Sequence, residues 1–189
     1  YNNELLLADG QSLYSYDESA SEWINKGTFQ SPIVTKFSVV RNTTSQSHQD
    51  GATHFSGMQL YAWEDSSGGV RYAVVDGDTG QIVVASSLLS STGIKPRVLV
   101  LNNTFLIYFY DVSATTLKVA SLPVTTPLAT PSVSTLTGTA ADDNAVNSTS
   151  PNYDAAIIGQ NIGVVFNNGT TSGATTVRLY NGNSPTTQL

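Results

Sequence analysis

The sequence contains no cysteine, and this absence removes three kinds of chemistry together. Disulfide bridges, thiol nucleophiles and cysteine-ligated zinc are all excluded. Charge is also scarce, because only 12% of the residues are Asp, Glu, Lys or Arg, about half the usual share. Serine, threonine, asparagine and glycine supply the polarity instead. Such a neutral polar composition is common in extracellular proteins and in proteins of virus particles.

Basic residues are few and scattered along the 189 residues, and the net charge is −6. No cluster of lysine and arginine could follow a phosphate backbone, so we expect no sequence-specific nucleic-acid partner. Long apolar runs are missing too, and we expect no membrane span. The chain opens at Tyr1 directly into a strand-like run, which we interpret as the sign of a segment from a longer chain.

Helical periodicity is nearly absent from the sequence. Short runs of Val, Ile, Leu, Tyr and Phe alternate with clusters of Asn, Gly, Asp, Ser and Thr, which is typical of strands joined by turns. The run FLIYFY at 105–110 is continuously apolar but too short for a helix. Such a run indicates a strand that is buried on both faces.

Three stretches share one plan of strand, polar turn and strand. They are residues 58–81, 105–122 and 162–182, and a further apolar run precedes each of them. Aligning Tyr61 with Tyr108 gives an interval of 47 residues, and aligning Phe109 with Phe166 gives 57, which the insertion 123–151 lengthens. A unit of about 40–50 residues has the size of one propeller blade.

We therefore predict an all-β fold, an antiparallel β-propeller of about four blade-like units within a single domain, residues 1–189. The units span about 1–31, 32–92, 93–151 and 152–189. The first unit lacks a full set of strands and the last stops soon after its third, so the ends suggest a partial ring. A β-sandwich built from similar hairpins is the alternative.

Two stretches resemble known blade motifs. The segment LYSYDESASEWINKG at 13–27 resembles a Kelch-type half-blade, in which an aromatic strand and a polar turn precede Trp and Gly. The segment AVVDGDTGQIVVAS at 73–86 resembles a quinoprotein-like blade. The residues that carry the two resemblances are Tyr14, Tyr16, Trp23 and Gly27 for the first, and Asp76, Thr79 and Gly80 for the second.

The whole chain has few charges, no cysteine, Ser-, Thr-, Asn- and Gly-rich hairpins, and irregular blades with long loops. In these features it resembles propeller-containing proteins of bacteriophage tails, of the nozzle type. This resemblance implies a non-enzymatic structural component of a phage tail or virion that acts through protein–protein contacts. Its partners would be other virion or tail subunits and further copies of itself, and its location the virion. We expect no catalytic residue, no cofactor and no bound metal.

Two other functions stay open. The first is a carbohydrate-binding or glycan-degrading surface module, in which exposed aromatic side chains would serve as platforms for a glycan. The candidates are Trp23, Tyr61, Trp63 and Tyr72. The alternation along the strand predicts that Tyr61 and Trp63 pack inward instead. The second is a secreted interaction propeller. Both would place the protein outside the cell or at its surface.

The sequence offers weak candidates for metal binding. His48 and His54 could approach one ion together with Asp50, but an exposed loop explains this segment better. The segment DGDTG at 76–80 has the alternating oxygens of a calcium loop. It lacks the later acid, because the twelfth position is Ser87. A tight hairpin explains the same residues without an ion.

Catalytic patterns are also weak. No Gly-x-Ser-x-Gly motif occurs. The acidic pairs Glu64–Asp65 and Asp142–Asp143 are adjacent in sequence, and neighbours on a strand point to opposite faces, so neither pair is predicted to act in glycoside hydrolysis.

The Thr/Ser/Pro-rich stretch 123–151 is either a surface connection or an arm that contacts a neighbouring subunit. The polar stretch 42–57 is predicted to be an extended blade loop.

Overall fold

The computed structural model describes residues 6–9, 12–17, 21–28, 46–66, 68–137, 151–167 and 175–189. The chain divides into two compact units, Tyr1–Val39 and Val40–Leu189, and each is described by itself. In the described ranges, no helix is long and apolar enough to cross a membrane.

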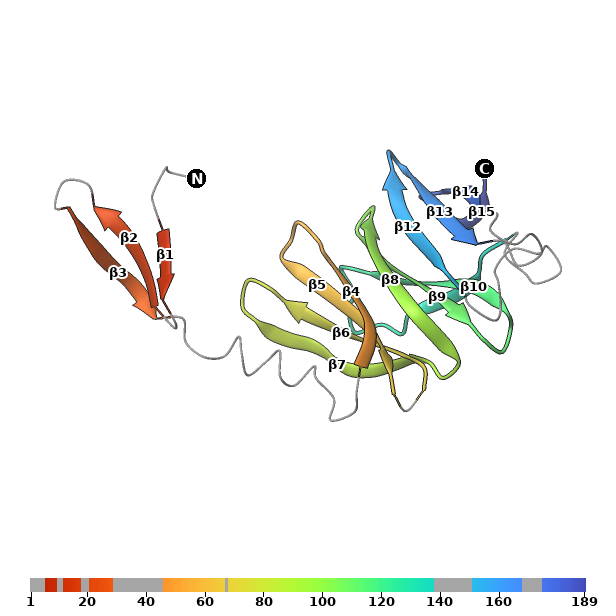
Figure 1. Cartoon of the computed structure of the whole chain (residues 1–189), viewed down its shortest axis with the longest axis horizontal. Coiled ribbons are helices and arrows are strands. Elements are labelled where there is room, and N and C mark those ends of the chain that lie inside the picture. The colour runs from red at the N-terminus through yellow and green to blue at the C-terminus, as the bar shows by residue number, and fades with distance from the viewer. Residues whose placement is uncertain are drawn as a thin grey trace. The chain divides into compact units, whose positions relative to one another are not determined.

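The first unit is a three-stranded antiparallel sheet in the order β1-β2-β3 (Figure 1). Its strands are β1 (Leu6–Asp9), β2 (Ser12–Asp17) and β3 (Glu22–Thr28). The Kelch-like stretch forms the β2–β3 hairpin, in which Tyr16 pairs with Trp23. The side chains of Tyr14, Tyr16 and Trp23 lie outside what the structure describes, so the role of Trp23 as a glycan platform stays a prediction.

The second unit contains three four-stranded antiparallel sheets. The front sheet has β4 (Gln46–Thr53), β5 (Met58–Asp65), β6 (Val70–Asp76) and β7 (Gln81–Ser90). The middle sheet has β8 (Gly93–Leu101), β9 (Thr104–Asp111), β10 (Thr116–Pro123) and β11 (Ser132–Thr135). The last sheet has β12 (Tyr153–Ile158), β13 (Asn161–Asn167), β14 (Thr175–Asn181) and β15 (Ser184–Gln188). Figure 1 shows each sheet as a meander of consecutive strands.

The middle sheet packs on both of its faces. In β9, Phe105, Ile107 and Phe109 join a cluster with the front sheet, whereas Leu106, Tyr108 and Tyr110 join a cluster with the last sheet. The alternation follows from the two-residue period of a strand. A two-layer sandwich leaves no sheet covered on both faces, so the sandwich alternative is wrong and the sheets are stacked like blades.

Three details of the sequence-based fold need correction. Because β5 and β9 have equal length and each ends in Asp, Ala62 and not Tyr61 is the counterpart of Tyr108. A slip of one residue moves a side chain to the other face. The polar stretch 42–57 is not all loop, because its Gln46–Thr53 part forms β4 by backbone pairing with β5. The last unit also does not stop after its third strand, since Ser184–Gln188 adds a fourth.

The stretch 123–151 is partly strand. Ser132–Thr135 forms β11 and pairs with β10, which completes the middle sheet. Leu136 is buried and its N–H donates to the carbonyl oxygen of Leu117. The described part of this stretch is therefore a connection built into the sheet. Residues 138–150, with the pair Asp142–Asp143, lie outside the described residues.

Candidate functional site

The first strands of the three sheets meet in the second unit. Strand β8 contacts β4 and β5 of the front sheet and β12 of the last sheet. Each of β4, β8 and β12 is an edge strand of its own sheet. Side chains and backbone groups from all three sheets therefore converge on the first half of β8.

Two of these edge strands carry irregularities at this place. The register shifts between Ser47 and Asp50 in β4, and between Ile94 and Arg97 in β8. His48 has φ 47° and Lys95 has φ 52°, values that side-chain-bearing residues rarely adopt. Each such residue costs on the order of 1–3 kcal/mol, and strained residues of this kind concentrate at functional sites. The irregular backbone makes this edge the first place to look for a site.

Three carboxylates contact the segment Lys95–Val98 of β8, each through a different residue. Glu64 Oε2 accepts a hydrogen bond from the backbone N–H of Lys95 at 3.1 Å. Asp50 Oδ2 accepts one from the backbone N–H of Val98 at 2.8 Å. Asp154 Oδ1 forms an ion pair with Arg97 Nε at 3.3 Å. The carboxylates come from β5, β4 and β12, so a short segment of β8 gathers acidic groups from the two neighbouring sheets.

The three carboxylates differ in what else they do. Both oxygens of Asp50 are used by backbone amides, because Oδ1 accepts the N–H of Gly51 at 2.9 Å. Glu64 Oε2 also lies 3.0 Å from Nδ1 of His48. Asp154 is the most open, with 67% of its side chain exposed. Asp50 therefore holds the strands together, whereas Glu64 and Asp154 each keep one oxygen directed away from these contacts.

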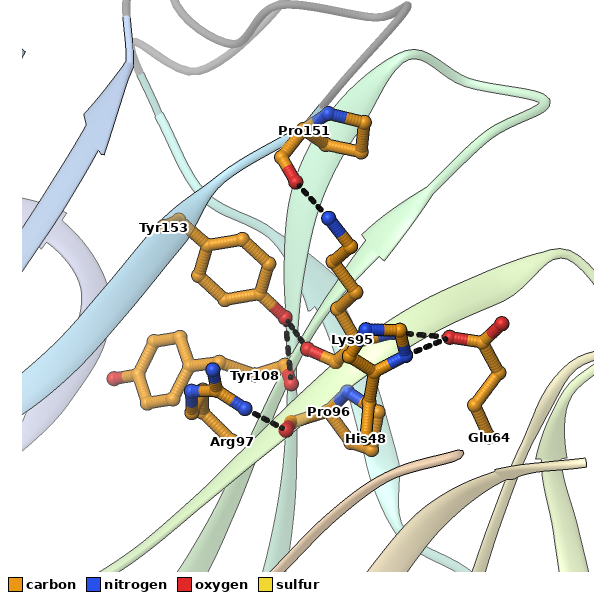
Figure 2. Close-up of polar contacts among 8 residues, drawn as sticks. All are labelled: His48, Glu64, Lys95, Pro96, Arg97, Tyr108, Pro151 and Tyr153. Atoms are coloured by element: carbon orange, nitrogen blue, oxygen red, sulfur yellow. Dashed lines mark hydrogen bonds and ion pairs between the residues drawn. The ribbon is translucent and has the colours of Figure 1, made fainter. Parts of the chain in front are cut away.

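Lys95 and Tyr153 fix the bulged segment from the side of the last sheet. Figure 2 shows the Lys95 side chain reaching the carbonyl oxygen of Pro151, which accepts a hydrogen bond from Nζ at 2.7 Å. The hydroxyl of Tyr153 lies within hydrogen-bonding distance of the carbonyl oxygens of Lys95 and Tyr108. Burial raises the pKa of the Tyr153 hydroxyl far above its usual value, so it remains a proton donor.

A hollow of about 250 Å³ adjoins this segment. Its wall combines an ion pair, amide groups and two aromatic rings. The residues include Arg97, Asn152, Tyr153, Asp154, Phe166 and Asn167. The arrangement offers charged, donor and acceptor groups next to an apolar surface, which is the usual make-up of a small-molecule site.

The histidines predicted as metal-ligand candidates take different partners. His48 contacts Glu64, whereas His54 lies in the β4–β5 turn, where its ring nitrogens contact Ser56 Oγ at 2.7 Å and Asn103 Oδ1 at 2.9 Å. Within the part of the chain that the structure describes, no group of three His, Asp or Glu side chains is placed to hold a metal ion.

The segment 76–80 forms the tight turn between β6 and β7. Asp76 Oδ1 accepts hydrogen bonds from the backbone N–H groups of Asp78 at 3.0 Å and Thr79 at 3.3 Å. An aspartate that caps its own turn in this way explains the Asp-Gly sequence.

The aromatic residues considered as glycan platforms are largely core residues. Trp63 is 2% exposed and Tyr72 is 6% exposed, so neither can stack on a ligand. Tyr61 is half-buried and donates its hydroxyl to Gln59. The inward packing predicted for Trp63 is confirmed.

Sequence reasoning missed Lys95, Arg97 and Asp154, and it set Glu64 aside. One signal was present, because Pro96 lies just before the apolar run Val98–Leu101, and proline inside a strand marks an edge or a bulge. The pairing of Glu64 with β8 depends on how two sheets meet, and nothing near Glu64 in the sequence encodes that contact.

No protein-family model matches the chain, and no curated protein matches it either. Several solved structures resemble it. A family 117 glycoside hydrolase of the marine bacterium Zobellia galactanivorans aligns with a TM-score of 0.51 and 11% identity, over 94% of this chain and 54% of that one. An endo-arabinanase of Bacillus licheniformis aligns with a TM-score of 0.45 and 10% identity, over 90% of this chain and 63% of that one. For an α-L-arabinofuranosidase of Clostridium thermocellum the TM-score is 0.48 and the identity 11%, over 100% of this chain and 68% of that one.

The likeness to the family 117 enzyme shows a propeller-like fold, so the predicted fold class is confirmed. The chain spans about half the length of that structure. The comparisons lend no support to a Kelch-type or quinoprotein-like family.

The functional hypothesis of a phage-tail or virion component is wrong. The family 117 structure, which aligns with a TM-score of 0.51, is a glycoside hydrolase, and this finding contradicts both that hypothesis and the expectation that the chain is not an enzyme. A virion location loses its basis with it. The resemblance to tail proteins rested on composition, and a low charge content with Ser- and Thr-rich hairpins suits any extracellular propeller equally well.

Proposed function

We propose that this chain is part of a propeller-type glycoside hydrolase, with the glycan bound over the Lys95–Val98 segment of β8. The observation that carries the proposal is the meeting of three carboxylates from β4, β5 and β12 on that segment. The fold likeness to a family 117 glycoside hydrolase supports it as an analogy of architecture.

The chemistry of glycoside hydrolysis needs two carboxyl groups across the scissile bond. One protonates the leaving oxygen, and the other acts as a nucleophile or activates water. Glu64 and Asp154 are the two candidates, because they approach the β8 segment from opposite neighbouring sheets and each retains an oxygen outside the contacts described above. Asp50 is a positioning residue, since its two oxygens bind backbone amides of β4 and β8.

The test is hydrolysis by the purified protein of a panel of polysaccharides that includes arabinan and xyloglucan, followed by the release of reducing ends. Glu64→Gln and Asp154→Asn should each lower the rate by about 10²–10⁴-fold, the usual contribution of a general acid or base. The matched control is Asp78→Asn, an exposed carboxylate in the β6–β7 turn. Folded wild-type protein that releases no sugar from any member of the panel would contradict the proposal, and so would variants that keep the wild-type rate.

A further inference from the structure

A second and larger cavity lies at the other end of β8. It has a volume of about 530 Å³ and is bordered by the β8–β9 turn, by the connection from β10 to β11 and by the β14–β15 turn. We call it the turn groove. Lys95 and Arg97 lie near the start of β8, whereas Leu101, its last residue, lines the turn groove. The groove is therefore separate from the candidate hydrolytic site.

The described lining of the turn groove is uncharged and combines apolar surface with polar side chains. None of the described residues that line it is ionisable, although they include six hydroxyl or amide side chains. These are Asn102, Thr104, Ser121, Thr130, Ser132 and Asn183. Hydroxyl and amide groups both donate and accept hydrogen bonds. Pro123 and Pro185 add aliphatic ring surface beside them.

One amide pair spans the turn groove from the middle sheet to the last sheet. Asn102 Nδ2 donates a hydrogen bond to Asn183 Oδ1 at 2.8 Å. This contact leaves Asn102 Oδ1 as an acceptor and Asn183 Nδ2 as a donor. A sugar hydroxyl is itself both donor and acceptor and can therefore pair with either group.

The walls of the groove are held in place before any ligand arrives. The backbone N–H of Asn183 donates to Asn181 Oδ1 at 2.9 Å, and that of Val124 donates to the carbonyl oxygen of Asn103 at 2.9 Å. A Cβ on Gly182 would lie 2.0 Å from the carbonyl oxygen of Gln160, so only glycine allows the β14–β15 turn to approach the β12–β13 turn this closely. A preorganised wall loses little entropy when a ligand binds.

We propose that the turn groove is a non-catalytic binding site for an uncharged oligosaccharide. The absence of ionisable side chains in its described lining disfavours an anionic chain, because no cation is present to compensate a buried carboxylate or sulfate. An extended peptide is the competing ligand. Such a peptide would pair mainly with backbone groups of a strand edge, whereas the six hydroxyl and amide side chains of the groove suit the hydroxyls of a sugar.

The experiment is a titration of the isotope-labelled protein with short oligosaccharides of xylose, arabinose or glucose, followed by backbone amide shifts in nuclear magnetic resonance. Shifts should concentrate on residues 101–104 and 182–185. Oligogalacturonate, a charged probe of similar size, should bind at least about tenfold more weakly. Shifts confined to other residues, equal binding of the charged probe, or shifts with a serine- and threonine-rich peptide but not with any sugar would each overturn the proposal.

Two variants on neighbouring positions of β11 provide the control. Ser132→Trp fills the groove and should abolish the shifts. Val133→Trp changes the next residue, which points to the opposite face of β11 and does not line the groove, and should leave them intact. Asn183→Leu should weaken binding about tenfold, as expected for the loss of one or two hydrogen bonds.

The outcome is distinguishable from that of the proposed hydrolysis. Glu64→Gln should abolish hydrolysis and leave the shifts at the turn groove unchanged. Ser132→Trp should abolish those shifts and leave the hydrolysis of a small aryl glycoside unchanged. If Ser132→Trp and Val133→Trp behave alike in the titration, the assignment of the ligand to the groove is wrong, whatever the fate of the hydrolytic proposal.

Discussion

The middle sheet and the last sheet have the same number of strands and the same connectivity, yet they bury different amounts of their surface. In β9 of the middle sheet, every residue from Phe105 to Asp111 is buried. In β14 of the last sheet, Val177 is 65% exposed and Leu179 is 42% exposed, whereas Tyr180 is fully buried. The middle sheet has a neighbour on each face. The last sheet packs one face against the middle sheet, and its other face carries exposed aliphatic side chains.

This difference shows that the position of a strand in the stack, and not its composition, determines how much of it is buried. Both sheets are rich in Val, Ile and Leu, but only the place of a strand in the stack decides whether an apolar side chain leaves water. The same kind of side chain contributes about 1.5–3 kcal/mol when it is fully buried and little when it stays exposed. The comparison therefore predicts that equivalent truncations in the two sheets have very different costs.

The largest expected effect is that of truncating a ring in β9. Phe109 is 1% exposed and packs against the front sheet, so Phe109→Ala should lower the free energy of unfolding by about 3–5 kcal/mol. Val177→Ala, on the open face of β14, should change it by less than about 0.5 kcal/mol. Denaturant unfolding of both variants measures the contrast. A loss of more than about 2 kcal/mol in Val177→Ala would show that something covers the open face in solution.

A smaller expected effect is the dependence of stability on pH, which should differ between the two sheets. Asp111, at the end of β9, is 3% exposed and pairs with Lys118. Burial alone would raise the pKa of its carboxyl group. The hydrogen bonds from Lys118, Ser113, Ala114 and Thr92 outweigh burial and hold the pKa well below its usual range. β13 of the last sheet ends instead in Asn167, which does not titrate.

The sign of the pH effect follows from this lowered pKa. Stability from Asp111 is fully present above the carboxyl pKa of the unfolded chain, near 3.9, and is lost as the pH falls toward the lower pKa of the folded state. Asp111→Asn should therefore cost about 1.5–3 kcal/mol at neutral pH and progressively less in acid. Thermal unfolding between about pH 7 and pH 2 measures it. A cost that does not change with pH would mean that Asp111 acts through shape and not through charge.

The middle sheet was also the more predictable one. The run FLIYFY indicates a strand that is buried on both faces, and β9, which contains this run, is buried on both faces. Aligning Phe109 with Phe166 is consistent with the structure, because both rings face the preceding sheet. Aligning Tyr61 with Tyr108 fails, since the sequence of a single strand does not show which of two adjacent residues faces a given side of the sheet. β4 was missed because it carries polar residues that alternation does not detect.

The candidate site was less predictable than the fold. Asp154 is far in sequence from Asp50 and Glu64, and what unites the three is the bulged segment of β8. A bulge is a property of two paired strands, so it becomes visible only when the register is known. Pro96 gives the position of the irregularity but not the groups that contact it. The turn groove has the same origin, because Asn102 and Asn183 meet only when two sheets are stacked.

The smallest expected effect concerns the contact between the two compared sheets. Tyr153 of β12 places its hydroxyl near the carbonyl oxygens of Lys95 and Tyr108, whereas Tyr180 of β14 donates its hydroxyl to the carbonyl oxygen of Thr137 at 2.9 Å. Burial raises the pKa of Tyr180 to about 12 and that of Tyr153 further, so both phenols are protonated donors at neutral pH.

Replacing either tyrosine with phenylalanine removes one hydroxyl and keeps the ring. Tyr153→Phe and Tyr180→Phe should each cost about 1 kcal/mol, the usual net value of one hydrogen bond. They should differ at β8, because only Tyr153 contacts the bulged segment. Amide hydrogen exchange should therefore become faster at Lys95 and Val98 in Tyr153→Phe, since their N–H groups donate to Glu64 and Asp50, and should stay unchanged there in Tyr180→Phe. Equal exchange in the two variants would mean that the front sheet alone holds the bulge, and that the last sheet packs beside it without fixing its geometry.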